Sequence, residues 1–244
     1  MKKIKNLMAA IILSFMACAV TVSCDFIEEL QPKDKPNAVG DIVFCDGTAA
    51  SYKVMSQLSN NQENRMIAII YKVENGKCWG VSLNAGSCSW GGDTDITTIR
   101  CVPEGTPGNY TFSGDTDGSD NIEAVKQFMN FATYDDLDER YPGFKRARHY
   151  SGGLTFDKDI ADCKDEYKSG WYVPSIAELY EIYKIRNIVK KAISCPDAFK
   201  TEQFWSSSQV TSNKECAYAI SFNDGTIQAK NKTESGRFFY VHEF

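Results

Sequence analysis

The chain is poor in the residues that build most metal centres. Of its 244 residues only two are histidines, His149 and His242, and no two of its nine cysteines form a Cys-x-x-Cys pair. Structural zinc sites need closely spaced Cys and His ligands. The sequence therefore predicts no zinc site, and we expect no metal and no cofactor.

A positive net charge is also missing. The formal charge is −5, and residues 1–23 hold three lysines and no acid, so the remainder carries −5 − 3 = −8. Nucleic-acid-binding domains are typically basic, so no nucleic-acid partner is expected. The basic run at 145–149 (KRARH) could meet an anionic polymer, although a solvated helix face is the more ordinary explanation.

A hydrophobic run long enough for a permanent membrane span is absent as well. Three lysines precede an apolar run over 7–22, which Ser14 interrupts and which is shorter than the about 20 residues that a span needs. A basic start, an apolar middle and small residues at the end are typical of a secretory signal. Residues 1–23 are therefore predicted to be a removed leader.

This leader resembles that of bacterial lipoproteins, in which a Cys becomes the first mature residue and carries the lipid. Thr21-Val22-Ser23-Cys24 fits, although Thr21 stands where Leu is usual, and Cys18 is the competitor. The resemblance implies palmitate on Cys24 and a chain exported and anchored to the cell envelope, in the outer membrane. We expect a tether over 24–39, rich in charge and proline, and one domain over 40–244.

Seven cysteines remain after Cys18 and Cys24, an odd number, so at least one is free or pairs between chains. Export permits disulfides. Their connectivity stays open, and the seven are Cys45, Cys78, Cys88, Cys101, Cys163, Cys195 and Cys216.

Short strands and two main helices predict an α+β fold. Strands are expected over 40–44, 65–73, 78–83, 217–222, 226–229 and 238–244, with a hairpin turn at Asn75-Gly76 and an irregular region over 84–120. Helices are expected over 122–131, 144–150, 175–184 and 187–193. A capping box predicts the start of the helix over 175–184, because Ser175 is followed three residues later by Glu178.

The second half resembles the family found at the C-terminus of Lcl, a bacterial collagen-like adhesin, and in many lipoproteins. The segments that carry the resemblance span about 115–244 and are DGSDNIEAV (117–125), GWYVPSIAELYEIY (170–183), FWSSSQ (204–209), AYAISFNDGTI (217–227) and FFYVHEF (238–244). One departure is Tyr240-Val241-His242, where the family often has Val-Arg.

That family is similar in fold to C-type lectins and to formylglycine-generating enzymes. The resemblance implies a C-type lectin-like domain with antiparallel strands and two main helices. It also implies that the Trp-x-x-Pro lead-in at 171–174 wedges the capped helix against a sheet, so that the motif residues are chiefly structural.

Calcium-dependent sugar binding is not predicted. Asp115 to Asp120 resembles the start of an oxygen-rich loop, but the twelfth position of an EF-hand would be Lys126 instead of Glu. The calcium motif Trp-Asn-Asp of sugar-binding lectins is here Trp205-Ser206-Ser207. A turn that caps the next helix is the simpler interpretation of 115–120.

Catalysis is not predicted either. The formylglycine-generating relatives use a cysteine pair, but no histidine neighbours Cys195 or Cys216 to activate a thiolate. Asp135 and Asp136 lie in a charged run that is expected to be solvated. An oxidase related to those enzymes is the least favoured alternative.

A binding face on loops above a rigid sheet is the remaining hypothesis. Phe204, Trp205 and Tyr218 either offer aromatic faces to a ligand or lie in the core, and for Trp205 the core is favoured. The predicted ligand-binding residues are Asn223, Lys230, Asn231, Arg237 and Tyr240. The ligand would be a protein or a glycan, and the chain would be an adhesin. A structural or assembly component of the envelope is the alternative.

Overall fold

Two sheets organise the part of the chain that the structure describes. The structure is a computed structural model, and it describes residues 32–58, 65–150, 163–193, 196–211 and 213–244. Pro32–Phe244 form one compact unit. Cys24 and the predicted leader lie outside the described residues.

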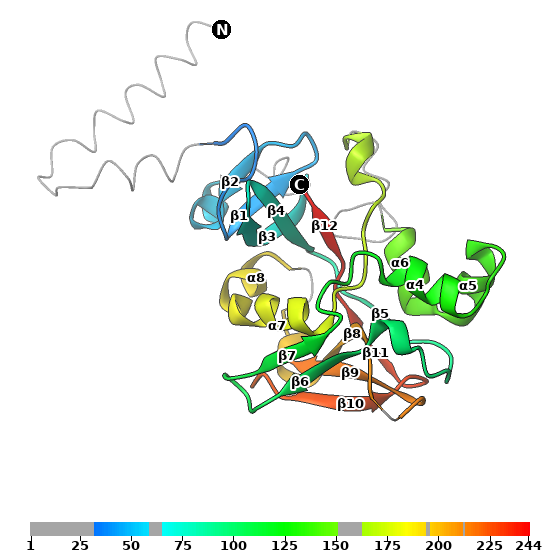
Figure 1. Ribbon diagram of the computed structural model, residues 1–244. Coiled ribbons are helices and arrows are strands. Elements are labelled where there is room, and N and C mark those ends of the chain that lie inside the picture. Colours follow the sequence, from blue (N-terminus) through cyan, green and yellow to red (C-terminus); the bar gives the residue numbers. More distant parts are fainter. Residues whose placement is uncertain (1–31, 59–64, 151–162, 194–195, 212) are drawn as a thin grey trace, which may run out of the picture. The chain divides into compact units, whose positions relative to one another are not determined.

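The first sheet is antiparallel and comes mostly from the N-terminal part of this unit. Its strands are β1 (Asp41–Phe44), β2 (Ala49–Ser51), β3 (Met66–Glu74), β4 (Lys77–Ser82) and β12 (Val241–Glu243). They are ordered β12-β4-β3-β1-β2, so the last strand of the chain lies at an edge beside β4. Figure 1 shows β12 running from the second sheet to the first.

The second sheet carries the motifs of the C-terminal half. Its strands are β5 (Gly86–Ser89), β8 (Gln203–Gln209), β9 (Cys216–Ser221), β10 (Ile227–Asn231) and β11 (Ser235–Phe238). They are ordered β10-β9-β8-β11-β5, and β8 and β11 are parallel while the other neighbours are antiparallel. A separate antiparallel ribbon joins β6 (Cys101–Glu104) and β7 (Thr111–Gly114).

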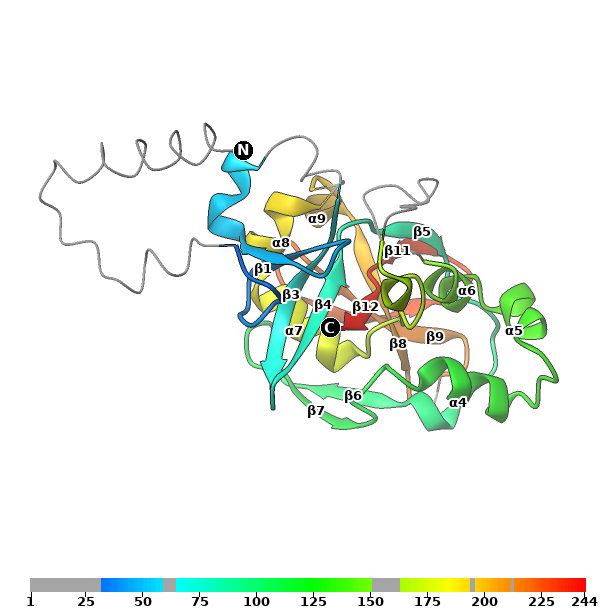
Figure 2. The same ribbon diagram turned by 90° about the horizontal axis from the view of Figure 1, so that it is seen from above.

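Helices lie on two sides of these strands (Figure 2). One group is α4 (Asn121–Phe128), α5 (Tyr134–Arg140) and α6 (Pro142–Arg148); the other is α7 (Ile176–Lys184), α8 (Arg186–Ala192) and α9 (Ala198–Thr201). Short 3-10 turns are η2 (Tyr52–Gln57), η3 (Thr97–Ile99) and η4 (Asp165–Tyr167). The predicted α+β class is confirmed. Within the described ranges, no helix has the length and apolar character to cross a membrane.

Local sequence signals placed several elements correctly. The turn at Asn75 and Gly76 has φ values of 51° and 79°, and it joins β3 to β4 as predicted. Helix α7 begins after the N-cap Ser175, whose side chain accepts a hydrogen bond from the Glu178 amide. These signals are local, and the structure confirms both.

The end of the chain differs from the expected single strand over 238–244. It is split into β11 and β12, and the buried residues Phe239 and Tyr240 connect the two sheets. The expected irregular region over 84–120 contains β5, η3, β6 and β7. Helix α8 starts without a side-chain cap and begins at Arg186, one residue before the expected start at 187.

Two sets of contacts hold the N-terminal residues of the compact unit against the rest of it. A disulfide joins Cys45 to Cys163 across 118 residues. Lys33, in the expected tether, exchanges backbone hydrogen bonds with Ala49 and pairs with Asp41 at 2.7 Å. The last part of the expected tether is therefore packed on the domain.

Candidate functional site

Three sequence motifs meet at one place, which we call the motif junction: residues 116–121, 175–178 and 206–208. The Ser175 hydroxyl donates to the Thr116 carbonyl (2.7 Å), and the Asn121 amide donates to Ser207 Oγ (2.7 Å). The Ile176 amide donates to Ser208 Oγ (2.9 Å). The motif residues thus bind one another.

Glu178 is the acceptor at the centre of the motif junction. Its Oε2 accepts from the amides of Gly118 (2.8 Å) and Ser175 (2.9 Å), and its Oε1 accepts from Tyr172 Oη (2.8 Å). Burial raises the pKa of Glu178, while these donors stabilise the charged form and oppose the shift. Every donor contacts the carboxylate from within the fold, so Glu178 is structural.

The Trp-x-x-Pro lead-in acts as the resemblance implied. Trp171 is buried and its Nε1 donates to the Tyr167 carbonyl (2.8 Å). Tyr172 exchanges two backbone hydrogen bonds with Val241 of β12, and the Pro174 carbonyl accepts from the Ser207 amide (2.8 Å). The lead-in thereby ties α7 to strands of both sheets.

The oxygen-rich groups considered for calcium are engaged in turns and strands. Asp115 and Asp117 each accept the amide two residues later, at 3.2 Å and 2.8 Å. Ser206 Oγ donates to the Tyr218 carbonyl (2.8 Å). These contacts match the expected turn before α4, although the Asp120 side chain makes no capping bond.

The predicted ligand-binding residues do not form one cluster. Asn223 is exposed in the turn before β10, whereas Asn231 ends the same strand. Lys230 Nζ donates to the Ser235 carbonyl (2.6 Å) and lies 4.9 Å from the ring centre of Trp205. Asn231 Oδ1 accepts from Thr233 and shapes the following turn.

Two of these residues need correction. Tyr240 is fully buried between the sheets, so its ring cannot contact a ligand at the surface. Arg237 is half-buried, its guanidinium binds both carboxylate oxygens of Glu202 at 2.8 Å and 3.0 Å, and it also donates to the Ala85 carbonyl. Arg237 joins β11 to its neighbours and is not the freely exposed group that we expected.

The described thiols are poor nucleophiles. Besides the disulfide, Cys78, Cys88, Cys101 and Cys216 are free. Burial raises the pKa of Cys88 and of Cys101 to about 11 and also raises the pKa of Cys78 and Cys216. Cys195 lies outside the described residues.

The basic run at 145–149 is partly neutralised by a buried acid. Asp138 of α5 is within 2.9 Å of His149 Nε2 and 2.8 Å of Arg148. Arg148 also stacks on the ring of Tyr134, at 4.2 Å from its centre. This arrangement joins α5 to α6 and favours the helix-face interpretation over a site for an anionic polymer.

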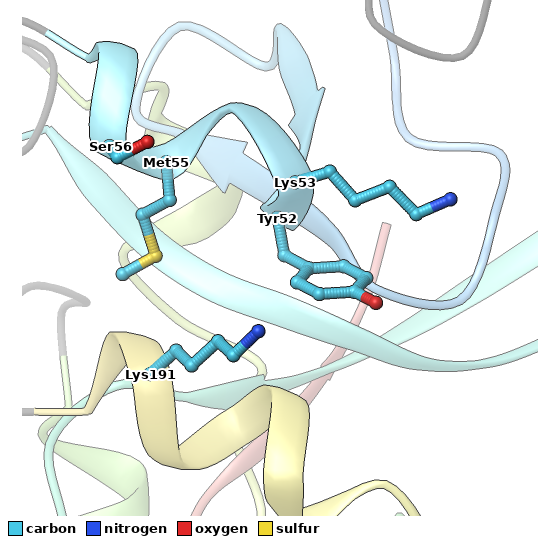
Figure 3. Close-up of a pocket in the computed structure, with 5 residues that line it drawn as sticks. All are labelled: Tyr52, Lys53, Met55, Ser56 and Lys191. Carbon is cyan, nitrogen blue, oxygen red and sulfur yellow. The ribbon is translucent and has the colours of Figure 1, made fainter. Parts of the chain in front are cut away.

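Sequence reasoning missed a pocket of about 560 Å³ between η2 and α8. Its lining residues are Tyr52, Lys53, Met55, Ser56 and Lys191 (Figure 3). They come from two segments 135 residues apart or more, and η2 is too short to show a helical period. The adjacent lysines Lys190 and Lys191, which are exposed in the structure, were the one local feature of the sequence that could have indicated a binding site there.

Comparisons with known proteins add a likeness of fold. No family model matches the chain, and no curated protein matches it. The structure is similar to the crystal structure of a fimbrial protein from Bacteroides ovatus, with a TM-score of 0.53 and 16% sequence identity. The likeness covers 84% of this chain and 48% of the fimbrial protein, so the chain spans about half of that protein's length.

Proposed function

We propose that the chain is an exported, lipid-anchored protein of the cell envelope that binds a ligand at the cell surface and catalyses no reaction. The observation that carries the proposal is the likeness to the Bacteroides ovatus fimbrial protein over 84% of the chain. The Cys45–Cys163 disulfide supports export, because such bonds persist in oxidising compartments.

The domain plan of the proposal has a leader over 1–23, a tether over 24–39 and a lectin-like domain over 40–244. Cys24 carries the lipid, and the anchor holds the domain at the outer membrane. The order of the motifs and their meeting in the motif junction support membership of the Lcl C-terminal family with its C-type lectin-like fold.

The absence of catalysis rests on the state of the reactive groups that the structure describes. The four free thiols have raised pKa values, which lowers the thiolate fraction at neutral pH. The carboxylate with the most donors, Glu178, is occupied by the fold itself. Binding is then the activity that the domain supports.

The binding face includes the polar residues of the β9–β10 hairpin and its following turn. Asn223 is exposed in the turn before β10, and Lys230 and Asn231 are partly exposed at the other end of that strand. A host or bacterial protein or a glycan would bind there through hydrogen bonds. Arg237 is on β11, which pairs with β8 and β5, and its contacts with Glu202 and Ala85 keep it apart from this face.

The second candidate is a structural or assembly component of the envelope. The same likeness favours it, because the chain matches about half of a fimbrial protein. Surface exposure separates the two functions, since an adhesin must reach ligands outside the cell.

Protease treatment of intact cells tests the proposal. We expect the domain to be cleaved or released while a periplasmic marker stays intact, and treated cells to lose binding to a glycan and matrix-protein array. Protection from the protease until the outer membrane is permeabilised would reject surface binding and support the envelope component.

A further inference from the structure

The pocket between η2 and α8 has walls from both elements. Figure 3 shows Met55 and Tyr52 descending from η2 toward α8, and Lys191 rising from α8 with its amino group directed at the Tyr52 ring. The Lys191 ammonium lies 5.1 Å from the centre of that ring. Ser56 adds a hydroxyl, and Lys53 extends away from Met55.

The aromatic wall is held in place by the backbone. The Tyr52 amide donates to the Gly40 carbonyl (2.9 Å), and Ser51 caps η2 by accepting from the Lys53 amide. Gly40 has a φ of +89°, and a Cβ there would lie 2.7 Å from Cδ1 of Tyr52. The ring therefore rests directly on a glycine and has a defined position.

The two elements bury their other sides. Val54 of η2 and Val189 and Ala192 of α8 are buried, which leaves Met55 and Lys191 toward the pocket. Core packing thus holds η2 and α8 in place on either side of the pocket.

The described lining of the pocket carries positive charge. Two lysines line it and none of the described lining residues is a carboxylate, in a chain of net charge −5. Lys53 has an interaction of its own, so Lys191 is the cation that concerns a ligand. Other exposed lysines of the C-terminal helices are paired, Lys184 with Glu181 and Lys200 with Asp197. Among the described residues no carboxylate pairs with Lys191, so its ammonium is available to an anion.

The remaining lining is apolar. The thioether of Met55 and the ring of Tyr52 are partly buried and face the Lys191 ammonium across the pocket. Met adapts to ligands of different shape, and an aromatic ring offers a flat apolar surface. A volume of about 560 Å³ is enough for a small molecule or for one or two residues of a peptide.

We propose that this pocket binds a carboxylate attached to a compact apolar body, with the carboxylate at Lys191 and the apolar body against Met55 and Tyr52. The ligand is either a free small acid or the C-terminal residue of a peptide. The inference rests on the proposed function, because it names the ligand chemistry of the same domain, at a site apart from the β9–β10 hairpin.

A matched pair of probes tests the charge requirement. N-acetyl-leucine and N-acetyl-leucinamide have the same apolar body, but only the first is charged. In ligand-observed NMR titrations of the full chain in a non-ionic detergent, we expect the acid to bind with a Kd on the order of 1 mM and about tenfold more tightly than the amide. Equal binding of the two would overturn the proposal.

Two neighbouring lysines supply a matched pair of variants. Lys191→Gln should remove the preference for the acid, whereas Lys190→Gln removes the same charge from α8 outside the pocket lining and should leave it unchanged. Both side chains are exposed, so both variants should fold. Equal effects of the two substitutions would show a general charge effect and reject the site.

Further probes separate the sources of the ligand. A peptide ending in leucine that binds at least as tightly as N-acetyl-leucine supports a peptide C-terminus, and weaker binding supports a free acid. Glucuronate binding as tightly as N-acetyl-leucine would reject the apolar requirement. Cell-surface exposure is measured separately by protease, so failure of the pocket is distinguishable from failure of the proposed function.

Discussion

Arg237 and Asn223 were both predicted to bind a ligand, yet their side chains have different surroundings. Arg237 contacts two elements through Glu202 and Ala85, whereas Asn223 is exposed in a turn. A sequence pattern that marks both as polar residues near a hairpin does not distinguish them. The difference is one of stability and can be measured.

Arg237→Ala should lower the free energy of unfolding by about 1 kcal/mol, because a two-oxygen ion pair and a bond to a backbone carbonyl are lost. Asn223→Ala should change it by less than about 0.5 kcal/mol, as exposed substitutions usually do. Chemical denaturation of both variants checks this. If Arg237→Ala left the free energy of unfolding unchanged, the original prediction of Arg237 as a ligand-binding residue would be supported.

Lys232 is a fully buried lysine that no motif predicted. Its Nζ donates to the Thr94 carbonyl (2.8 Å) and to Gln209 Oε1, and it lies 4.4 Å from the centre of the Trp90 ring. Burial lowers the pKa of Lys232 from 10.5 to about 8. A buried lysine is rare, and this one joins the turn after β10 to β8 and to the segment after β5.

The lowered pKa of Lys232 predicts how stability depends on pH. Between about pH 8 and 10.5 the unfolded chain binds more protons than the folded chain, so the free energy of unfolding rises with pH. The contribution is fully present above pH 10.5 and is lost as pH falls through 8. Relative to Lys232→Met, wild type should gain about 3 kcal/mol across this window, measured by denaturation at each pH. A difference that does not vary with pH would contradict the shifted pKa.

At the scale of elements, helix α7 shows how a local signal and a tertiary role coincide. The capping box was readable because both members lie within four residues of each other. The contact of Glu178 with Gly118 could not be predicted from the sequence, because 60 residues separate the two and pairing over that distance depends on the whole fold. The element was therefore predictable, whereas its partner was not.

Removing the Glu178 carboxylate should destabilise the chain more than replacing it with an amide. Glu178→Ala leaves two backbone amides and Tyr172 Oη without an acceptor, and we expect a loss of about 2–4 kcal/mol. Glu178→Gln keeps one oxygen for the two amides, so a loss of about 1 kcal/mol is expected. Thermal and chemical unfolding check both values.

Glu181→Ala on the same helix is the matched control. Its carboxylate is half-exposed and pairs with Lys184, so the change should stay within about 0.5 kcal/mol. If Glu178→Ala were as mild as this control, the motif junction would not stabilise the fold.

At the scale of the whole molecule, the sequence predicted the α+β class and the strands β9 and β10, but it did not predict β8, the separate strand β11 or how the sheets connect. The expected last strand over 238–244 begins with an apolar run over 238–241, and nothing in that run marks where the chain leaves β11. Phe239 and Tyr240 are buried between the sheets because Val241 pairs with both Tyr172 and β4. Such pairings arise only when distant segments meet, which also explains why Tyr240 was assigned to a binding face.

The candidate pocket was hidden for the same reason. Its two walls are far apart in the sequence, and each is unremarkable alone: a short turn after β2 and a lysine pair on a helix. The motifs that were readable form the motif junction, which stabilises the domain. The motifs of the junction therefore report the fold, while the pocket residues lie outside every recognisable motif.

The predicted lipid anchor concerns where the whole molecule is held in the cell. Cys24 follows Ser23 at the end of the apolar leader, whereas Cys18 lies six residues earlier inside the apolar run. Several acyl chains are needed for firm anchoring, since one chain binds a membrane only weakly. In cells fed labelled palmitate, Cys24→Ala should abolish the label and leave the precursor unprocessed or the product released from membranes. Cys18→Ala is the matched control and should keep both the label and the membrane association. If the label persists in Cys24→Ala but disappears in Cys18→Ala, the anchor is at Cys18 and the tether is six residues longer. If both variants keep the label, neither cysteine is the lipidated residue, and the uncleaved leader would hold the chain in the membrane.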